Sequence, residues 1–542
     1  MAIIAMAALF PVMAVVAQHR NPELKTPAIT VPAGASIASI QDALTTLGNN
    51  GGGTLRISAG RYSGRASGSL LSIPSGIKVL CQPGAVIVNS ADHSGVLSFA
   101  GVSHSGIEGC TLVGSNGVPS QPIDSTSGRV VQITQGSSHI TVKNCDISGH
   151  EFAGILVDDA RLLTIANNRF HDGTNTSSLT TSPLANDFIA WGTMRDSIVF
   201  GNRFLSQNDI GIMCGPQTSR SSTCAGNSFS YNEIRGKYLY GIALYGNSGF
   251  PTQTVVHNTV SNNRIRDIYS RTAFSPPSNN AGEAVYLVDA DDNTVINNEA
   301  ENTMQGRTGV VLPLGAISVA NGTRNVVRSN HVVASGWGCY HVVGNNAAGT
   351  SGTLVEGNTC RGAARFGYWN DLSDRSRYIA NSARDVGTGG IEGGCFIIAR
   401  SAFVELSRNS CRGGRDQGFY VDQASSETVL NENISRQNSN AGYVIAGSPV
   451  TLVGNIARNN TGPGFVFGAD GGTVYASWND ASDDRGLHAR QTFGYLERNS
   501  SKLLSLSHNT GRGNSVRLWS ITSPNVFSLG NQGFPDKHLD AQ

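Results

Sequence analysis

Short apolar runs bounded by Gly and Asn alternate with polar turns along most of this chain. Asparagine recurs in similar frames, such as Ile296-Asn297-Asn298-Glu299-Ala300, at intervals of 22 to 35 residues. A period of this size indicates one supersecondary unit stacked on copies of itself. The fifteen positions are Asn144, Asn168, Asn202, Asn232, Asn263, Asn298, Asn330, Asn358, Asn381, Asn409, Asn433, Asn455, Asn479, Asn509 and Asn531.

Most repeats also carry a second apolar run that opens with Gly, for example Gly241-Ile242-Ala243-Leu244 and Gly418-Phe419-Tyr420-Val421. Runs of this length between Gly and Asn are typical of strands rather than helices. Asn tolerates the left-handed turn between two sheets, and stacked copies share amide hydrogen bonds. We therefore interpret the asparagines as structural. Strands about 4.8 Å apart would give a rod about 70 Å long.

A different pattern precedes the repeats. In Ser36–Leu47, apolar residues recur at helical spacing, with Ser36 as a candidate N-cap. Gly51-Gly52-Gly53-Thr54 and then Ala59-Gly60-Arg61-Tyr62 follow. This stretch resembles the N-terminal cap of right-handed parallel β-helix proteins, the pectate-lyase-like superfamily. The resemblance implies an all-β solenoid of roughly 14–16 rungs over residues 36–535, with a capping helix at 36–48 and a tail at 536–542. The same fold hosts lyases, hydrolases, epimerases and adhesins, so it does not fix the chemistry.

Composition narrows the setting. Residues 1–17 are apolar and end in Ala17, as in a secretory signal peptide, and residues 18–35 form an extension. This predicts a secreted or periplasmic protein, and no later segment is apolar enough to cross a membrane. The formal net charge of +1 argues against nucleic acid as a partner.

The chain has nine cysteines, an odd number, and no CxxC motif that would indicate a zinc site. Cys214 and Cys224 flank a loop and are the best candidates for a disulfide. Cys110 and Cys145 occupy equivalent repeat positions and could stack or bond. We interpret Cys360 and Cys411 as small core residues.

Aromatic residues recur two positions after the Gly of the second strand. Alternation predicts that this position points outward. Stacked outward aromatics would form a platform for sugar rings, although loops or a partner chain could instead cover this face. A register error of one residue would place the rings in the core. The positions are Tyr286, Val311, Tyr340, Trp369, Phe396 and Tyr420.

Carboxylates lie near this column. Glu283 and Asp289 flank one strand, and Asp371 and Asp422 share a position four residues after the Gly of their repeats. Glycoside hydrolysis requires two carboxylates about 5–9.5 Å apart. Each of these acids, taken singly, could also be a solvated surface residue.

A second pair is formed by Asn186-Asp187-Phe188-Ile189 and Asn208-Asp209-Ile210-Gly211-Ile212, with 22 residues from Asp187 to Asp209. The pair weakly resembles the polygalacturonase family, in which Asn-Thr-Asp is followed one rung later by Gly-Asp-Asp-Cys-Ile-Ala-Ile. Asn208 replaces one of that family's aspartates, and its Gly-His-Gly and Arg-Ile-Lys motifs are missing. The family's activity is therefore not implied, but Asp187 and Asp209 remain a candidate acid/base pair.

A lyase would need a base to remove the proton beside a uronate carboxylate, with Ca²⁺ as an optional helper. The candidates for this role are Arg365, Arg415, His341 and Tyr340. The segment Asp289-Ala290-Asp291-Asp292 could bind a cation but reads equally well as a polar turn, so we assign no metal site.

Together these patterns predict a secreted enzyme that hydrolyses a polysaccharide or oligosaccharide in a groove on the outer face, without a cofactor. The insertions 171–185 and 266–282 would wall the groove. A polysaccharide lyase, an epimerase and a non-catalytic glycan-binding surface or spike protein remain alternatives. The sequence leaves open the identity of the sugar and whether chains trimerise.

Overall fold

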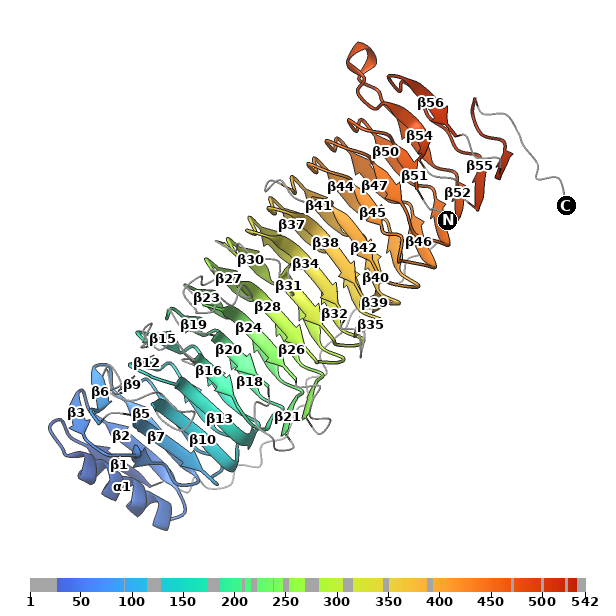
Figure 1. The fold of residues 1–542 in the computed structure, drawn as a ribbon. Helices are drawn as coiled ribbons and strands as arrows, with labels where there is room; N and C mark the ends of the chain where they lie inside the picture. Colours follow the sequence, from blue (N-terminus) through green and yellow to red (C-terminus); the bar gives the residue numbers. More distant parts are fainter. Residues whose placement is uncertain are drawn as a thin grey trace, which may run out of the picture.

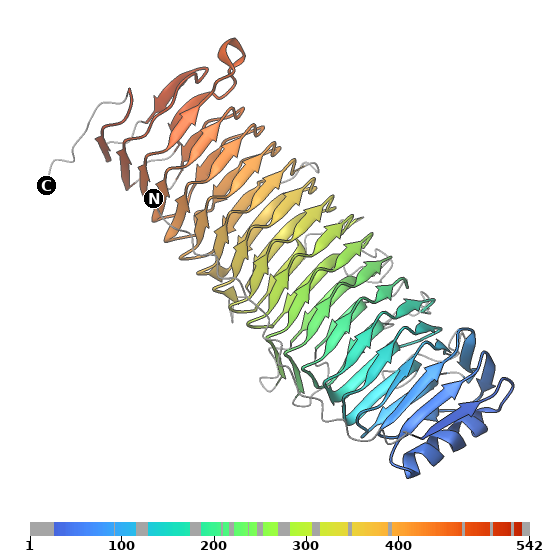
Figure 2. The ribbon, with the colours of Figure 1, turned by 180° about the vertical axis from the view of Figure 1, so that it is seen from behind.

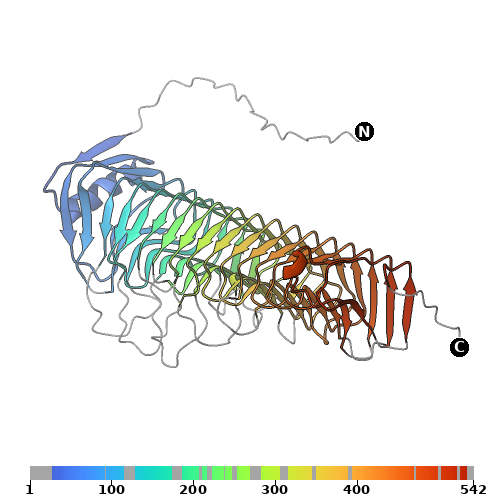
Figure 3. The same ribbon diagram turned by 90° about the horizontal axis from the view of Figure 1, so that it is seen from above.

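In the computed structural model the chain forms a long rod of stacked strands, with one helix at its N-terminal end (Figures 1 and 2). The structure describes residues 27–533 except 92, 115–127, 174–185, 207–209, 216–221, 237, 247–252, 269–281, 306–314, 345–349, 388–392, 469–471, 499–501 and 522–524. A typical rung contributes a strand to each of three parallel sheets, which we name A, B and C. Figure 3 shows the rungs stacked in register along the rod. The predicted all-β parallel β-helix is confirmed.

Sheet A contains 19 strands, from β1 (Ala28–Val31) to β57 (Val526–Leu529). Sheet B contains 16 strands, from β3 (Gly60–Gly64) to β53 (Asp480–Ser482). The chain passes from sheet C to sheet A to sheet B within a rung, as in β10, β11 (Thr141–Lys143) and β12 (Asp146–Ser148). The main strands of sheet C are β4 (Ser69–Ser72), β7 (Gly95–Ala100), β10 (Arg129–Ser138), β13 (Ala153–Arg161), β16 (Asn186–Ala190), β20 (Ile210–Cys214), β24 (Tyr240–Tyr245), β28 (Glu283–Val288), β31 (Gly315–Ala320), β34 (Gly338–Val343), β38 (Phe366–Asp371), β42 (Phe396–Ala399), β45 (Phe419–Val421), β48 (Tyr443–Ile445), β51 (Phe465–Phe467), β54 (Phe493–Glu497) and β56 (Arg517–Ser520).

The predicted helix caps the rod. Helix α1 (Ile37–Asn49) begins after Ser36, whose hydroxyl accepts a hydrogen bond from the N–H of Ser39 at 3.1 Å. Its buried face consists of Ile40, Ala43, Leu44 and Leu47, at the spacing that the sequence predicted. These side chains close the apolar end of the first rungs, since a solenoid core is otherwise open to water there. Strand β1 precedes α1 and pairs with β2 (Gly53–Ile57), so part of the predicted extension 18–35 belongs to sheet A.

The asparagines form a continuous ladder at the corner between sheets A and B. The side-chain oxygen of Asn232 accepts hydrogen bonds from the N–H and the amide group of Asn202, at 3.0 and 3.1 Å. The amide group of Asn202 also donates to the carbonyl of Ile165 at 2.9 Å. The same contacts repeat as far as Asn531. The predicted structural role is therefore confirmed, because the ladder satisfies buried backbone groups at every rung.

Asn144 is an exception to this prediction. It is exposed, adopts φ 54°, and donates to the Glu108 carboxylate at 3.1 Å. The N–H of its neighbour Cys145 instead donates to Asn168 at 2.9 Å, so Cys145 occupies the ladder position. A left-handed turn residue precedes each ladder residue, and here the sequence places its Asn in the turn.

Eight aromatic rings stack inside the core along the C-terminal part of sheet C. Neighbouring ring centroids lie 4.2 to 5.1 Å apart. The tyrosine hydroxyls donate to ladder carbonyls, as Tyr443 does to Asn433 at 2.7 Å, so each buried polar tip is satisfied. The rings are Tyr340, Tyr368, Phe396, Phe419, Tyr443, Phe465, Tyr495 and Trp519.

The described residues contain four disulfides, of which Cys81–Cys110 joins two neighbouring rungs and the other three join positions within a rung. The pair Cys214–Cys224 is the one that the sequence predicted. Cys110 bonds to Cys81 rather than to Cys145, which is a buried free thiol whose pKa is raised to about 12 by burial. The prediction that Cys360 and Cys411 are simple core residues is wrong, because they form disulfides with Cys339 and Cys395, respectively.

Candidate functional site

The outer face of sheet C is apolar and aromatic rather than polar. Strand register aligns Ala243, Tyr286, Ser318, His341 and Trp369 in one outward row. Ile397 and Tyr420 continue the row on the next rungs. Three apolar clusters cover this face, one around Phe152 and Met213, one around Tyr286 and Val343, and one around Trp337 and Phe366. We call this row and its clusters the sheet C strip.

The predicted aromatic column is split by the register. Tyr286, Trp369 and Tyr420 lie in the strip, as predicted. Tyr340 and Phe396 do not, because each is almost fully buried in the core stack. The residue two positions after the Gly faces outward in some rungs and inward in others. A fixed count from the Gly therefore assigned Tyr340 and Phe396 to the wrong face of the sheet. Val311 lies outside the described residues.

The C-terminal part of the strip combines rings with basic groups. The ring of His341 lies 5.2 Å from that of Trp369 and is fully buried. The guanidinium of Arg365 lies 3.3 Å from the centre of the Trp337 ring, a cation–π contact. A Cβ on Gly338 would overlap the ring of Phe366, so glycine is required where this ring folds over the strand.

Glu283 lies on the same outer face. It pairs in register with Tyr240, whose ring packs against the strip and stacks on Tyr286 at 5.2 Å. Because Tyr240 faces outward, Glu283 faces outward too, yet its side chain has no exposed surface. A fully buried carboxylate on an outer face is unusual, since burial of a charge is costly unless it is paired.

Asp187 occupies a different environment from the one predicted. It is fully buried at the corner between sheets B and C. The hydroxyl of Tyr238 donates to one carboxylate oxygen at 2.6 Å, and Nε2 of His150 lies 2.8 Å from the other. Burial, followed by the charge of Asp187, raises the pKa of Tyr238 well above its usual value. Asp187 therefore sits in a closed polar network rather than in an open groove.

The register also removes the proposed equivalence of Asp187 and Asp209. Asn186 pairs with Ile210 and Phe188 with Ile212, so the residue level with Asp187 on the next rung is Gly211. Asp209 itself lies outside the described residues, as do most of the insertions 171–185 and 266–282.

A second histidine–carboxylate pair adjoins the first. Glu151 is fully buried, and one of its carboxylate oxygens lies 2.7 Å from Nδ1 of His93. His150 and Glu151 are neighbours in the chain, so two such pairs meet at one corner. Five residues near these sites were not predicted from the sequence: His93, His150, Glu151, Tyr238 and Tyr240. The adjacent His150-Glu151 before an apolar strand was the available signal.

The remaining predicted carboxylates do not form a catalytic pair with Glu283. Asp289 follows the far end of β28, about 20 Å along the strand at 3.3 Å per residue. Asp187 lies on β16, which is three strand spacings or about 14 Å from β28. Both separations exceed the range of about 5–9.5 Å needed for a glycosidase pair.

Asp371 and Asp422 are joined through one arginine. The guanidinium of Arg400 donates to both oxygens of Asp371, at 2.9 and 2.5 Å. The N–H of Arg400 donates to Asp422 at 3.1 Å, and Ser425 donates to the same carboxylate at 2.6 Å. These contacts close the turn after sheet C, which explains the two acids as structural residues.

The segment 289–292 also forms a polar turn. Asp291 accepts hydrogen bonds from the N–H and the hydroxyl of Thr323, at 2.7 and 2.8 Å, and Asp292 pairs with Arg324. Among the residues that the structure describes, no three His, Cys, Asp or Glu side chains are grouped to hold a metal ion. The helix of the described chain is not long and apolar enough to span a membrane.

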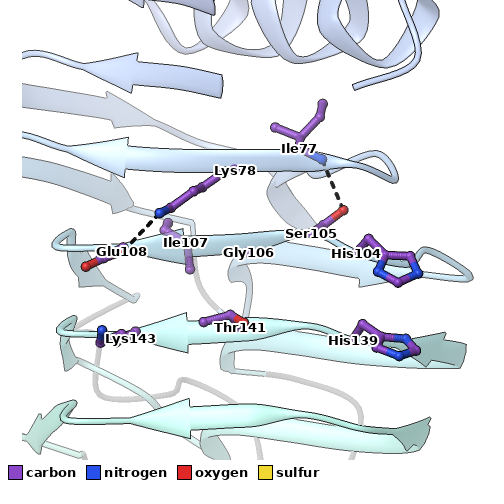
Figure 4. A pocket seen from close by; sticks show the side chains of 10 residues that line it. All are labelled: Ile77, Lys78, His104, Ser105, Gly106, Ile107, Glu108, His139, Thr141 and Lys143. Carbon is purple, nitrogen blue, oxygen red and sulfur yellow. Dashed lines mark hydrogen bonds and ion pairs between the residues drawn. The ribbon is translucent and has the colours of Figure 1, made fainter. Parts of the chain in front are cut away.

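A separate hollow of about 430 Å³ lies on the outer face of sheet A, near the N-terminal end (Figure 4). It forms where Gly106 leaves a gap in the row between Lys78 and Thr141. His104 and His139 stack at 4.3 Å on one side of it, and Lys78 pairs with Glu108 at 3.5 Å. The hollow lies on a different sheet from the strip and shares no residue with it.

Comparison with known proteins supports the architecture. Residues 72–203 match the family model described as "Right handed beta helix region". No curated protein matches the sequence significantly. The solved structures similar to this chain include a Streptococcus pneumoniae surface protein and adhesin, PfbA, at 13% identity and a TM-score of 0.48, covering 79% of this chain and 100% of that one.

Two further similar structures contain oligosaccharides. The tailspike protein of E. coli bacteriophage HK620, in complex with a pentasaccharide, is 12% identical with a TM-score of 0.45, covering 92% of this chain and 78% of that one. The catalytic domain of a GH87 alpha-1,3-glucanase, in complex with tetrasaccharides, is 14% identical with a TM-score of 0.43, covering 73% of this chain and 66% of that one. Similarity at this level does not carry a function across. The stacked parallel sheets and the matched region identify the fold of this chain as a right-handed parallel β-helix.

Proposed function

We propose that this protein binds a polysaccharide along the sheet C strip and cleaves it there, with Glu283 as the acid/base group. The observation that carries the proposal is the position of Glu283, a fully buried carboxylate on the outer face of the sheet. A buried carboxylate that stands beside aromatic side chains on an outer face is a candidate for acid/base chemistry.

The neighbours of Glu283 fit a sugar ligand. Tyr240 and Tyr286 stack beside it, and Trp369 and Tyr420 remain partly exposed further along the strip. Aromatic faces accept the CH faces of sugar rings while polar groups at the edges bind hydroxyls. The strip follows the axis of the rod, as an extended oligosaccharide would require.

Hydrolysis is the preferred reaction in this proposal, with Glu283 protonating the leaving oxygen. Neither Asp187 nor Asp289 lies at a suitable distance from Glu283. Asp209 is the other candidate for the paired acid that the sequence predicts. The role of Asp187 becomes that of a positioning residue for the corner at which sheets B and C meet.

A second reaction, β-elimination on a uronate-containing glycan, is favoured by the basic end of the strip. His341 and Arg365 lie there beside Trp369 and Trp337. An imidazole could remove the proton next to a uronate carboxylate, and a guanidinium could hold that carboxylate. In this reaction Glu283 would not be required, whereas His341 would be.

The test is incubation of the purified protein with neutral glucans and polyuronates. New reducing ends without ultraviolet absorbance from an unsaturated product would indicate hydrolysis, and both signals together would indicate elimination. Binding without a product from any sugar would contradict cleavage and leave a glycan-binding surface protein.

The matched variants are Glu283→Gln and Glu356→Gln. We expect Glu283→Gln to lower kcat at least about 100-fold, the usual effect of losing an acid/base group. Glu356 is on sheet A and pairs with Arg328 at 2.7 Å, so its substitution should leave activity unchanged. Full activity in Glu283→Gln together with loss in His341→Ala would replace hydrolysis by elimination.

Secretion is part of the proposal. Four disulfides are typical of proteins that fold in oxidising compartments. The signal peptide predicted at 1–17 lies outside the described residues, and assembly into trimers stays a prediction.

A further inference from the structure

Five arginines stand in one outward row on the C-terminal half of sheet B. The strands are β37 (Thr359–Arg361), β41 (Ser382–Arg384), β44 (Ser410–Arg412), β47 (Ile434–Arg436) and β50 (Ile456–Arg458). The last residue of each strand is an arginine, and it lies in register with the last residue of the next strand along the rod. We call Arg361, Arg384, Arg412, Arg436 and Arg458 the arginine row.

Few of these charges are neutralised within the described residues. Arg384 pairs with Asp385 at 3.2 Å, and Arg458 pairs with Asp484. Arg412 donates only to the neutral amide of Gln437, at 2.9 Å. Arg361 and Arg436 form no ion pair with any residue that the structure describes. The row thus keeps a surplus of positive charge on an exposed sheet face.

The surroundings leave the row accessible. The next outward row on the same strands is uncharged and mostly small, with Thr359, Ser382, Ser410, Ile434 and Ile456. A hollow of about 340 Å³ lies over the row, lined by Arg412, Arg436, Gln437, Arg458, Asn459 and Asp484. It offers guanidinium and amide donors together, which is the donor set that carboxylate and sulfate groups accept.

Strands about 4.8 Å apart set the spacing of the row, so like charges are held close together along about 19 Å. Such an array repels itself unless counter-charge is present at a similar spacing. A linear anionic polymer with a charge on most of its sugar residues supplies this. We propose that the arginine row binds an acidic polysaccharide, carboxylated or sulfated, on sheet B, a surface separate from the sheet C strip.

Nucleic acid fits the row less well. The row is a single line without an aromatic side chain on which bases could stack, and the chain as a whole has a formal net charge of only +1. Acidic glycans need only the charges and the donors. The proposal does not depend on cleavage at Glu283, since it concerns binding at another sheet.

The experiment measures binding of the full chain to polygalacturonate, dextran sulfate, unmodified dextran and single-stranded DNA over a range of salt concentrations. The test variant is Arg361→Gln, Arg412→Gln and Arg436→Gln together, which removes the three arginines without a carboxylate partner. The matched control is Arg203→Gln, Arg264→Gln and Arg328→Gln, which removes the same charge from arginines paired with Glu233, Glu299 and Glu356.

We expect the protein to bind an acidic glycan with an affinity that falls steeply with salt. The test variant should lose at least about tenfold in affinity and show a smaller salt dependence, whereas the control should lose less than about threefold. Retention of binding in the matching triple substitution to Lys would confirm that charge is responsible, and thermal unfolding would show that all variants are folded.

Comparison of the two anionic polymers shows which class of acidic glycan the arginine row binds. Binding of polygalacturonate alone would assign carboxylated glycans, and binding of both polymers would assign polyanionic glycans in general. Equal loss in the test and control variants, tighter binding of single-stranded DNA than of either glycan, or binding of unmodified dextran with the same affinity would overturn the proposal.

Discussion

The two halves of sheet B carry different patterns of charge on their outer faces. In the N-terminal half, arginines face carboxylates on neighbouring rungs and form ion pairs with them, in partial alternation. The pairs Arg203–Glu233, Arg264–Glu299 and Arg266–Glu301 lie at 2.9, 3.3 and 3.1 Å. In the C-terminal half, five arginines follow one another without such alternation.

The difference shows what an in-register solenoid does to surface charge. Each outward position meets the same position of the next rung at about one strand spacing, so neighbouring charges in a row either pair with each other or repel each other. Two unit charges about 5 Å apart in water interact by about 0.8 kcal/mol. An alternating row stabilises the rod by itself, whereas an arginine row is better suited to an external anion.

The halves differ inside as well. The N-terminal half buries carboxylates against histidines at the corner of sheets B and C, as in His150–Asp187 and His93–Glu151. The C-terminal half fills its core with the ring stack from Tyr340 to Trp519. Buried histidine–carboxylate pairs thus characterise the first half, and a buried ring stack characterises the second.

The largest effect should come from the ring stack. Phe419→Ala removes a fully buried ring between Phe396 and Tyr443, and we expect the free energy of unfolding to fall by about 3–5 kcal/mol. Urea unfolding measures this. Tyr475→Ala, at an exposed position on the outer face of sheet A, is the control and should change stability by less than about 1 kcal/mol. A similar loss for both residues would mean that the stack does not hold this half together.

The next largest effect on stability should come from the polar corner of the N-terminal half, where Asp187 contacts His150 and Tyr238. Asp187→Ala leaves the His150 imidazole and the Tyr238 hydroxyl buried without their shared partner, which should cost about 3 kcal/mol. Thermal unfolding and activity per folded molecule should be measured together. Complete loss of activity in a folded Asp187→Asn variant would return Asp187 to the catalytic role that the sequence predicted.

The stability of the C-terminal half should depend on pH through the buried carboxylate of Asp483. Burial opposes the charge of Asp483, but donation from Arg485, at 2.8 Å, and from the N–H groups of Arg490 and Gln491 outweighs it and lowers the pKa of the Asp483 carboxyl from 3.8 to about 2. The folded pKa is below the unfolded value, so this contribution is present above about pH 4 and is lost as pH falls towards 2. We expect a loss of about 2 kcal/mol over that window. In Asp483→Asn the loss should be smaller by this amount, and an unchanged acid profile would contradict the assignment.

The smallest effects on stability should come from substitutions that introduce the charge pattern of one half into the other. Arg412→Glu places a carboxylate between Arg384 and Arg436, and should stabilise the rod by about 0.5 kcal/mol at low salt. Glu233→Arg places a third cation between Arg203 and Arg264, and should destabilise it by a similar amount. Both effects should fade at high salt, because exposed charges are screened. Equal responses of the two variants would show that the rows do not act as electrostatic units.

Much of the fold could be predicted because it repeats. The Asn period predicted the ladder, and the apolar spacing after Ser36 predicted the capping helix. Single positions were harder to predict. Asn144 falls in the turn before the ladder, and Tyr340 and Phe396 fall in the core, since a shift of one residue reverses the face of a strand.

The candidate site depended more on tertiary structure. Residue type identified Glu283, His341 and Trp369 as candidates, but only the register shows that they share one outer face. The same register places Gly211, not an aspartate, level with Asp187 on the next rung. The fold also joins Asp371 to Asp422 through Arg400. The sequence by itself determined the repeat, the cap and the strand-rich composition, because these depend on local spacing. Only the tertiary structure decided which rows face water and which charges stand together, because these depend on how distant rungs align.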